Sequence, residues 1–491
     1  MKNEDKDTTS TWNKIAFGFG QIGDMVSYQT FTIMIFVFYY GAIGINSNWI
    51  MIGFIIWSIW NSINDPLLGI VSDRTKKKMG RRRFWIIIAT IPTAIIMILL
   101  WTPPLLFGIT SGTVDGMLLN FIYFLVVICI FDFFYTMFSL NATSVFPEMF
   151  LYKKERNKAA MWRNILSIIG LIIAFLLPIA IIGDTKDPVN LFNLNYFIAS
   201  VIISTIFIIC EVIFIKWGLK ERAEFKEDPA KNPGFLKSLK ICLTNKSFLI
   251  YVLANLGNWY VYGLIPTIIL LYGQWVIFYP WYSGETDIFM SIGLLFAFIV
   301  GGILQPLWKK IGLKLGNRKG AMIGFAAWGA AFIPFLFVGR GWPFYFLSLI
   351  LMVFAGVGIG ASLYFKDLLM SEIIDEDEVK SGVRREGTYY GVNALIIRLA
   401  TIFVIISINI VFNGASWEIY QPGILDPTLF IIGLKSLMSI FPAVACALVI
   451  LCLYFYPIHD DRLLNIKKEL AKMHQVKRDK SNLKSTSGKR P

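Results

Sequence analysis

Long apolar segments dominate this chain, and they decide what it can fold into. About 20 mainly apolar residues form a helix long enough to cross about 30 Å of hydrocarbon, and the 491 residues contain twelve such windows. Hydrophobic residues make up 56% of the chain and charged residues only 16%, a balance that is too apolar for a soluble globular protein. The sequence therefore predicts an all-α membrane protein with twelve transmembrane helices. The windows are 13–41, 49–72, 84–102, 117–146, 160–183, 195–216, 247–273, 286–308, 320–339, 343–370, 388–414 and 429–457.

The basic residues alternate between the two sides of the membrane. One set of inter-window loops, together with both ends of the chain, holds nearly all of them, whereas the opposite loops hold only Lys186 and Arg340. Basic residues favour the cytoplasmic side, so we expect a multi-pass protein of the cell (plasma or inner) membrane with both termini in the cytoplasm. Topology thus explains the net charge of +14 without a nucleic-acid partner. The expected surroundings are the lipid bilayer, and a monomer is expected. The basic loops are 73–83, 148–159, 216–246, 309–319 and 371–387.

The longest inner loop, 217–246, divides the windows into two sets of six. Residues 1–216 are predicted to form an N-terminal half and residues 247–457 a C-terminal half. Transporters built from two such halves hold a solute site near the bilayer midplane and expose it to each side in turn. The basic tail, 458–491, is predicted to begin as a short helix through Leu470 and to end disordered on the cytoplasmic face.

Asp65 lies about 16 residues inside an apolar segment, where an ionised carboxylate must meet a cation, a basic partner or water. Pro66 has no amide hydrogen and frees the carbonyl of Ser62, while Asn61 falls one turn before Asp65 on the same helical face. These oxygens are hard ligands that suit a proton or a small cation. We therefore predict a cation site at Asp65, Asn61 and Ser62, with Asp65 as the metal ligand if the coupling ion is sodium. The alternative is a buried aspartate that pairs with a base and binds nothing.

Asp24 is a second intramembrane acid, about ten residues into the first window. Gln21 and Gln29 are nearby, so one helical face is predicted to turn toward a water-filled cavity, and we include Asp24 among the cation-binding candidates. A packing role with a single hydrogen-bond partner is the alternative.

The remaining chemistry-bearing residues exclude several classes of site. The only two histidines, His459 and His474, follow the last window, which excludes a histidine proton relay through the membrane or a histidine-ligated zinc centre. The five cysteines lie in apolar windows or an inner loop, so no disulfide framework is expected. No cofactor is expected other than a coupling ion, a proton or sodium.

The run D-P-L-L-G-x-x-x-D-R-T followed by G-R-R-R resembles the signature of the glycoside-pentoside-hexuronide cation symporters, a branch of the major facilitator superfamily that includes melibiose permease. The matching residues are Asp65, Gly69, Asp73 and Gly80. Melibiose permease has a second cation-binding aspartate where this chain has Asn61. That departure puts sodium coordination in doubt and favours a proton or no coupling ion.

The resemblance also implies substrate-binding positions in the first half. In PEMFLYKKERNKAAMWRNILSIIG, Arg163 falls where that family places a substrate or gating arginine, although it could equally be an inner anchor. Ser139 and Thr143 stand at the positions of the sugar-binding aspartate and tryptophan, so the galactoside contacts are missing. Asp132, two turns earlier, is the candidate to replace the acid.

In the second half the candidates come from two segments. Asn258 and Tyr260 belong to a polar and aromatic surface that suits stacking against a sugar or hydrogen bonding between helices. GVRREGTYYGVNALIIRLATIF resembles the family's eleventh helix and places Arg398 where melibiose permease has a functional lysine. Tyr390 shares its helical stripe and Asn393 is adjacent. An arginine in mid-bilayer needs a partner or water, so Arg398 is expected to pair with Asp65 or with Asp24.

Three functions compete at this point. The first is a secondary active transporter that couples sugar or glycoside symport to a proton or sodium by alternating access. The second is a facilitator-type carrier of an organic anion or a lysolipid, which would suit Arg163 and Arg398. The third is a membrane-embedded enzyme or sensor, which no nucleophile motif or metal-ligand cluster supports, so we expect a transporter and not an enzyme.

Overall fold

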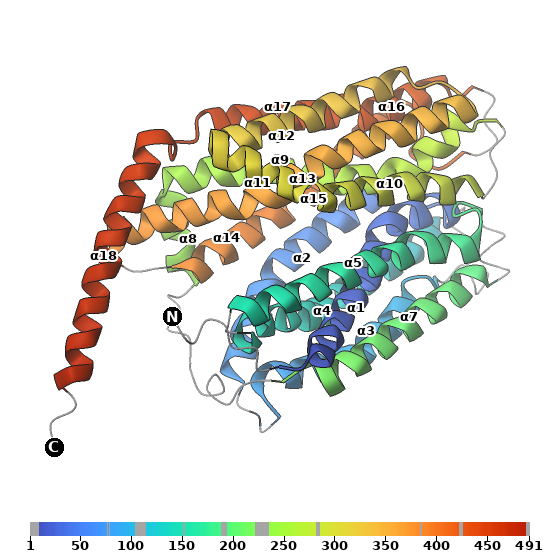
Figure 1. Ribbon diagram of the computed structural model, residues 1–491. Helices are drawn as coiled ribbons and strands as arrows, with labels where there is room; N and C mark the ends of the chain where they lie inside the picture. The colour runs from blue at the N-terminus through green and yellow to red at the C-terminus, as the bar shows by residue number, and fades with distance from the viewer. Residues whose placement is uncertain are drawn as a thin grey trace.

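The computed structural model describes residues 9–75, 77, 79–103, 114–150, 153–187, 194–220, 235–280, 285–382, 385–421 and 426–487. Across these ranges the chain is helical and contains no strand. Figure 1 shows the helices up to α7 as one bundle and those from α9 to α17 as a second bundle beside it, with α18 leading away from them.

The first bundle consists of six long helices. They are α1 (Thr11–Val37, continued by the π-helical turn Phe38–Ala42), α2 (Ser47–Arg74), α3 (Arg81–Leu99), α4 (Val114–Met149), α5 (Lys153–Ile182) and α7 (Asn195–Ile213, continued by the π-helical turn Phe214–Gly218). A short helix, α8 (Phe235–Thr244), follows. The predicted central loop includes residues 221–234, which lie outside the described part of the chain, so the boundaries of the two halves stay predictions.

The second bundle contains shorter pieces as well as long helices. They are α9 (Lys246–Tyr272, continued by the π-helical turn Gly273–Ile277), α10 (Glu285–Ile303), α11 (Gln305–Leu315), α12 (Asn317–Phe332, continued by the 3-10 turn Ile333–Phe337), α13 (Trp342–Ser381), α14 (Glu386–Arg398), α15 (Ala400–Gly414), α16 (Thr428–Met438) and α17 (Ile440–Tyr454). The tail forms α18 (Asp460–Ser487).

The twelve predicted transmembrane helices are present. Eleven helical stretches are long and apolar enough to cross a membrane by length and composition. The twelfth is α2, 28 residues long, whose polar residues Asn61, Asn64 and Asp65 make it less apolar than the others. The prediction of an all-α fold with twelve spans is confirmed.

The structure corrects the predicted ends of several helices. The window 388–414 is two helices, α14 and α15, interrupted at Leu399, and the window 429–457 is α16 and α17, interrupted at Ser439. Pro442 lies in the first turn of α17, where its missing amide hydrogen is tolerated. Most of the predicted inner loop 309–319 is helical, because Pro306 stands at the start of α11 and Trp308 is buried.

Two helices continue past their predicted ends. The helix predicted to stop at residue 370 runs to Ser381, because its acidic end is buried against neighbouring helices: Glu376 accepts a hydrogen bond from the Ser247 hydroxyl at 2.8 Å and pairs with Arg462 of α18. The tail helix, predicted to end near Leu470, runs to Ser487.

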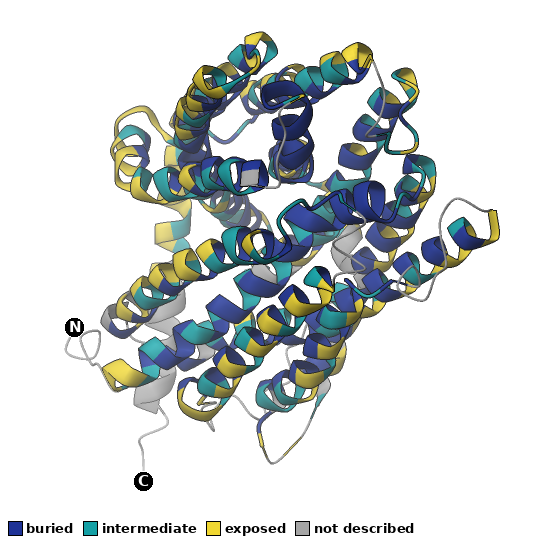
Figure 2. Ribbon diagram, turned by 90° about the vertical axis from the view of Figure 1, so that its right-hand side faces the viewer, coloured by how far each residue is buried: buried dark blue, intermediate teal, exposed yellow. Residues whose placement is uncertain are grey.

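Apolar residues are buried between the helices and exposed on the outside of the bundles. Figure 2 shows buried residues facing inward and exposed ones following the outer helix faces. On α2 the exposed large side chains recur at helical spacing and are apolar, as expected of a surface that faces lipid. They are Trp49, Ile52, Ile56, Ile59, Trp60, Ile63, Leu67 and Val71.

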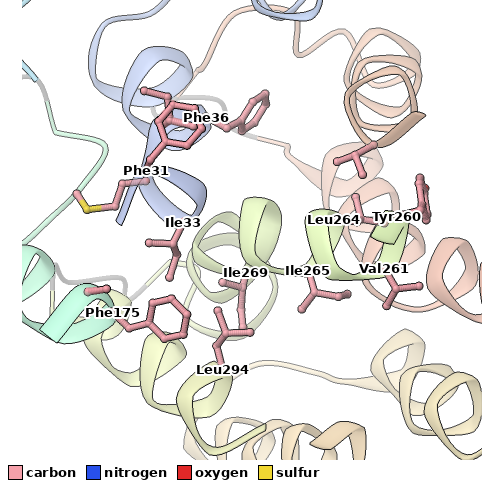
Figure 3. Packing of buried hydrophobic residues seen from close by; sticks show 14 of the residues in the cluster. Phe31, Ile33, Phe36, Phe175, Tyr260, Val261, Leu264, Ile265, Ile269 and Leu294 are labelled. Atoms are coloured by element: carbon pink, nitrogen blue, oxygen red, sulfur yellow. The ribbon is translucent and has the colours of Figure 1, made fainter. Parts of the chain in front are cut away.

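The two bundles meet through apolar residues near their middle. Figure 3 shows Ile33 of α1 and Phe175 of α5 approaching Ile269 of α9 and Leu294 of α10. All four side chains are buried. These apolar side chains pack the two bundles against each other, and polar contacts join the bundles at other places.

Polar contacts join the bundles at the end that carries residues 43–46, 183–187 and 415–421, which we call the distal end. The Tyr40 hydroxyl donates to the Trp417 carbonyl oxygen at 2.5 Å, and the Ser47 amide donates to the Glu418 carbonyl oxygen at 2.7 Å. The Lys186 ammonium lies 2.8 Å from each carboxylate oxygen of Asp287, and both side chains are fully buried. The structure is therefore closed between the bundles at the distal end.

Candidate functional site

An ion pair between Asp65 of α2 and Arg398 of α14 joins the bundles inside the membrane-spanning region. Asp65 Oδ2 accepts hydrogen bonds from Arg398 Nη2 at 2.9 Å and from Nε at 3.2 Å. The side chains are 16% and 29% exposed, so the pair is largely removed from water. Of the two partners that the sequence allowed for Arg398, the structure places Asp65 against it.

Local helix geometry brings these two residues together. Arg398 is the last residue of α14, and α15 begins two residues later, so the guanidinium group lies at a helix C-terminus, where the helix dipole favours a cation. On α2, the Ser62 hydroxyl donates to the Ser58 carbonyl oxygen at 2.9 Å and approaches the Leu395 carbonyl oxygen of α14 at 3.5 Å. The interruption at Leu399 thus separates the segment that pairs with α2 from the rest of the span.

Asn61 supplies an oxygen without a partner one turn before Asp65. The side chain is 1% exposed, and its Oδ1 atom is buried and accepts no hydrogen bond. Buried polar atoms in folded proteins nearly always have partners. An unpaired amide oxygen on the same helical face as a carboxylate is what a small-cation site needs.

A polar stripe on α4 connects the predicted acids. Its members recur at spacings of three and four residues and therefore share one helical face. The Thr136 hydroxyl donates to Asp65 Oδ1 at 3.0 Å, whereas the Tyr135 and Ser139 hydroxyls donate to Asp24 Oδ1 at 2.9 and 2.7 Å. The full stripe is Asp132, Tyr135, Thr136, Ser139 and Thr143.

Asp24 lies in a second cluster and not beside the Asp65 pair. Gln21 donates to its other carboxylate oxygen at 3.0 Å, so both oxygens of Asp24 are satisfied. The cavity next to it, about 20 Å³, is lined by residues of α1, α4 and α5 and by Phe214. It is large enough for a water molecule. The lining residues are Phe17, Gly20, Gln21, Asp24, Ser139, Ala142, Thr143, Arg163 and Phe214.

Arg163 lines the same cavity as Asp24 and attracts it electrostatically, but the two do not form an ion pair. Its guanidinium carbon lies 4.8 Å from the centre of the Phe146 ring, and no described acid comes within ion-pair distance of it. Three of the predicted substrate positions, Ser139, Thr143 and Arg163, therefore lie together with Asp24. Asp132 lies elsewhere: it is buried and accepts a hydrogen bond from Asn64 Nδ2 at 3.2 Å.

The polar candidates of the second bundle bond to one another. Asn255 donates to Asn393 at 3.0 Å, Asn258 donates to Asn255 at 3.4 Å, and the Ser362 hydroxyl donates to Asn258 at 2.5 Å. This is the helix-to-helix bonding that the sequence allowed as the alternative for this surface. Tyr260 donates to the Ser407 hydroxyl at 2.9 Å, and Tyr390 is 43% exposed.

Sequence reasoning missed four residues of these clusters. Thr136 and Tyr135 could have been found from their spacing to Ser139 along α4, but Asn64 could not, because its partner comes from another helix. The fourth is Glu211 of α7, a fully buried acid in an apolar window, and the rule that singled out Asp24 applies to it equally. Among the described residues no group of three or more acids, histidines and cysteines could hold a metal ion.

The sequence matches one family model, described as MFS/sugar transport protein, over residues 16–460. The chain belongs to this family. It is therefore a membrane transporter of the major facilitator superfamily and not an enzyme.

Curated members with similar sequences cover nearly the whole chain. A sodium-dependent lysophosphatidylcholine symporter of Danio rerio is 21% identical over 96% of this chain and 90% of its own length. A proposed sulfoquinovose importer of Salmonella typhimurium is 24% identical over 100% and 98%. A proposed 2,3-dihydroxypropane-1-sulfonate exporter of the same organism is 25% identical over 94% and 96%.

Solved structures share the fold at low identity. The nucleoside transporter NupG superposes with a TM-score of 0.63 at 15% identity, covering 91% of this chain and 100% of that one. A D-xylose-proton symporter superposes with a TM-score of 0.56 at 15% identity, covering 91% and 95%.

Proposed function

We propose that this chain is a cation-coupled symporter of the glycoside-pentoside-hexuronide branch, and that its solute is a sugar-sized polar molecule with a strongly anionic group. The observation that carries the proposal is that Arg163, without an ion pair, lines a cavity together with Gln21, Ser139 and Thr143. The acid of this cavity, Asp24, is held by hydrogen bonds from Gln21, Tyr135 and Ser139. An arginine presents a planar fork of donors that matches a sulfonate or phosphate.

The relatives support an anionic solute. The names of three of them specify sulfoquinovose, 2,3-dihydroxypropane-1-sulfonate and lysophosphatidylcholine, and each of these compounds carries a sulfonate or a phosphodiester group. The proposal therefore combines two of the sequence-based hypotheses, a sugar symporter and a carrier of an organic anion. Ser139 fits this solute, because a second acid in that position would repel it.

The coupling cation is assigned to Asp65. In the described arrangement Arg398 and Thr136 satisfy its carboxylate, so a proton or sodium ion that binds there must displace the guanidinium group. The unpaired Asn61 oxygen and the Ser62 carbonyl would complete its shell. Because Asp65 and Arg398 belong to different bundles, cation binding would loosen a contact between them, which is how binding can bias alternating access.

The arrangement in the membrane is part of the same proposal. Residues 1–216 and 247–457 form the two moving halves, the distal end faces outward, and both termini lie in the cytoplasm, in line with the positions of the basic loops. The closed distal end would then correspond to a state that exposes the site to the cytoplasm.

The first test is uptake of radiolabelled sulfoquinovose into proteoliposomes. We expect Arg163→Gln to weaken the apparent affinity roughly 10- to 100-fold, because charge-assisted hydrogen bonds contribute about 1.5–3 kcal/mol. Arg163→Lys should keep part of the apparent affinity. Ser144→Ala is the control and should keep the full affinity, because it removes an α4 hydroxyl that bonds only the Leu140 carbonyl. Uptake of uncharged melibiose in preference to sulfoquinovose, or of lysophosphatidylcholine alone, would contradict the proposed solute.

The second test concerns the coupling cation. Asp65→Asn should abolish concentrative uptake while the protein stays folded, because a neutral amide cannot bind and release the coupling charge. Since Asn61 replaces a second acid, we expect a proton gradient to drive uptake at least as well as a sodium gradient. Accumulation in wild type under each gradient separately is the measurement. Strict sodium dependence without a response to pH would show that the amide and the freed carbonyl are enough for sodium.

A further inference from the structure

The carboxyl group of Glu211, on α7, lies in surroundings that do not stabilise a negative charge. The residue is 0% exposed, and both of its carboxyl oxygens are buried without a hydrogen-bond partner. An ionised carboxylate deprived of water, hydrogen bonds and a counter-ion is strongly disfavoured, and such a group becomes neutral by binding a proton. The described state of the protein therefore favours the protonated acid.

The site is built by α1 as well as by α7. A Cβ atom placed on Gly23 would lie 2.2 Å from Glu211 Oε1 and 3.3 Å from a ring carbon of Phe207. Only a residue without a side chain leaves room for the carboxyl group at this helix contact. Gly23 precedes Asp24, so the unpartnered acid lies against the turn of α1 that carries the hydrogen-bonded one.

No base on the packed helices neutralises Glu211. Its helix packs against α1, α3 and α5. From α1 the nearby ionisable group is Asp24, which repels a second negative charge, and from α5 it is Arg163, which faces the cavity beside Asp24. The arginines of α3 lie in its first turn, where Arg82 donates to the Ser72 hydroxyl at 3.0 Å, and residues 84–99 contain no ionisable side chain. The remaining neighbours are Cys210 of the same helix, Lys216 over the Trp217 ring, and Tyr135, which donates to Asp24.

We propose that Glu211 is a proton-binding residue, and that Glu211 and Asp24 together form a proton site of the N-terminal helices, separate from the Asp65 and Arg398 pair. This deepens the proposed function and rests on it, because it adds a proton to the cations that transport can move. The surroundings are apolar apart from Asp24, so the site suits a proton and not a metal ion, which would need several oxygen ligands.

Loading and release need only proton transfer with water. The Glu211 carboxylate takes one proton and becomes a neutral carboxylic acid, and release returns that proton to water. The small cavity beside Asp24 is lined by the polar side chains of Gln21 and Arg163 and is large enough for one water molecule. When α1 and α7 separate enough to admit water or to bring Arg163 closer, the ionised form is stabilised and the proton leaves.

The direct test is infrared difference spectroscopy of the purified full-length protein in detergent at neutral pH. Wild type should show the carbonyl stretch of a protonated carboxylic acid, shifted in heavy water. Glu211→Gln should lose this band, whereas Asp65→Asn should keep it. Since glutamine imitates the protonated acid, Glu211→Gln should also unfold at the same temperature as wild type. A band that is unchanged in Glu211→Gln, or absent from wild type, would overturn the proposal.

A second variant tests the fit at Gly23 without touching the acid. Gly23→Ala should displace the carboxyl group and shift or remove the band, and Gly302→Ala, where nothing lies within 4 Å of the added Cβ, should leave it unchanged. An unaltered band in Gly23→Ala would show that the acid does not occupy the space described.

Transport distinguishes this proposal from the proposed function. With sulfoquinovose as the probe, Glu211→Gln should lose accumulation driven by a pH gradient and keep counterflow exchange, because exchange needs no net proton movement. Full pH-driven accumulation in Glu211→Gln would overturn the coupling role. If wild type fails to transport sulfoquinovose under any gradient, the proposed solute is wrong, and the infrared measurement still decides whether Glu211 holds a proton.

Discussion

Arg398→Ala is expected to abolish transport and to lower the free energy of unfolding by about 3 kcal/mol. Removing one member of a buried ion pair leaves the other charge uncompensated, at a cost of roughly 3–5 kcal/mol. The lower end applies here because Asp65 keeps the Thr136 hydrogen bond and is 16% exposed. Thermal unfolding in detergent and uptake in proteoliposomes measure the two effects. Arg398→Lys should retain part of the transport activity and part of the stability, since lysine keeps the charge but loses the second donor.

The double variant separates loss of the pair from loss of arginine packing. Asp65→Asn added to Arg398→Ala removes the uncompensated carboxylate, so stability, or exchange without a gradient, should partly recover. Lys319→Met is the matched control, because that ammonium group is exposed, lies 3.8 Å from Asp460 and is not paired with Asp65. If Arg398→Ala transports normally, the contact that switches between the halves must be sought at Arg163 or Lys366.

The fold could be predicted because its strongest signal is local. A run of about 20 apolar residues is recognised without knowing its neighbours, and twelve such runs are found as helices. The interruptions at Leu399 and Ser439 could not be predicted in the same way, since a break of one residue leaves the apolar composition unchanged. The extension of α13 to Ser381 depends on Ser247 and Arg462 of other helices, which hold its buried acid Glu376.

The candidate site was predictable where a charge stands alone in an apolar segment. Asp65 and Arg398 are of this kind, and because each needs a partner their pairing could be anticipated from charge and from the family resemblance. Asn64 carries no such signal, because an amide is tolerated in membrane helices, and the only signal for Thr136 is its spacing to Ser139 along α4. The prediction that Asp24 belongs to the cation site could not be checked from the sequence, because it depends on which residues of α4 contact each acid. The structure shows two groups, one around each acid.

Lys186 and Asp287 pair at the distal end, and Lys186→Met is expected to lower the free energy of unfolding by about 3–5 kcal/mol. The ammonium lies 2.8 Å from both carboxylate oxygens, the Thr185 hydroxyl donates to Asp287 at 2.7 Å, and both charged side chains are 1% exposed. Without the lysine, Asp287 keeps a buried charge that Thr185 cannot neutralise. The unfolding temperature in detergent is the measurement.

The matched double variant decides between a structural pair and a gate. Lys186→Met with Asp287→Leu replaces both charges by apolar groups, a change that is often neutral for a buried pair, so stability should recover. Because Lys186 follows α5 and Asp287 begins α10, the pair joins the two bundles at the end that must open for alternating access. The single variant should therefore label more readily with a membrane-impermeant thiol reagent at a cysteine introduced at Ser47, while a cysteine introduced at Val114, which is exposed at the distal start of α4, labels equally with and without the Lys186→Met change. If the single variant is destabilised but labelling at Ser47 is unchanged, the pair only stabilises the loop and is not a gate. The contact that closes the distal end would then be the hydrogen bond from Tyr40 to the Trp417 carbonyl oxygen.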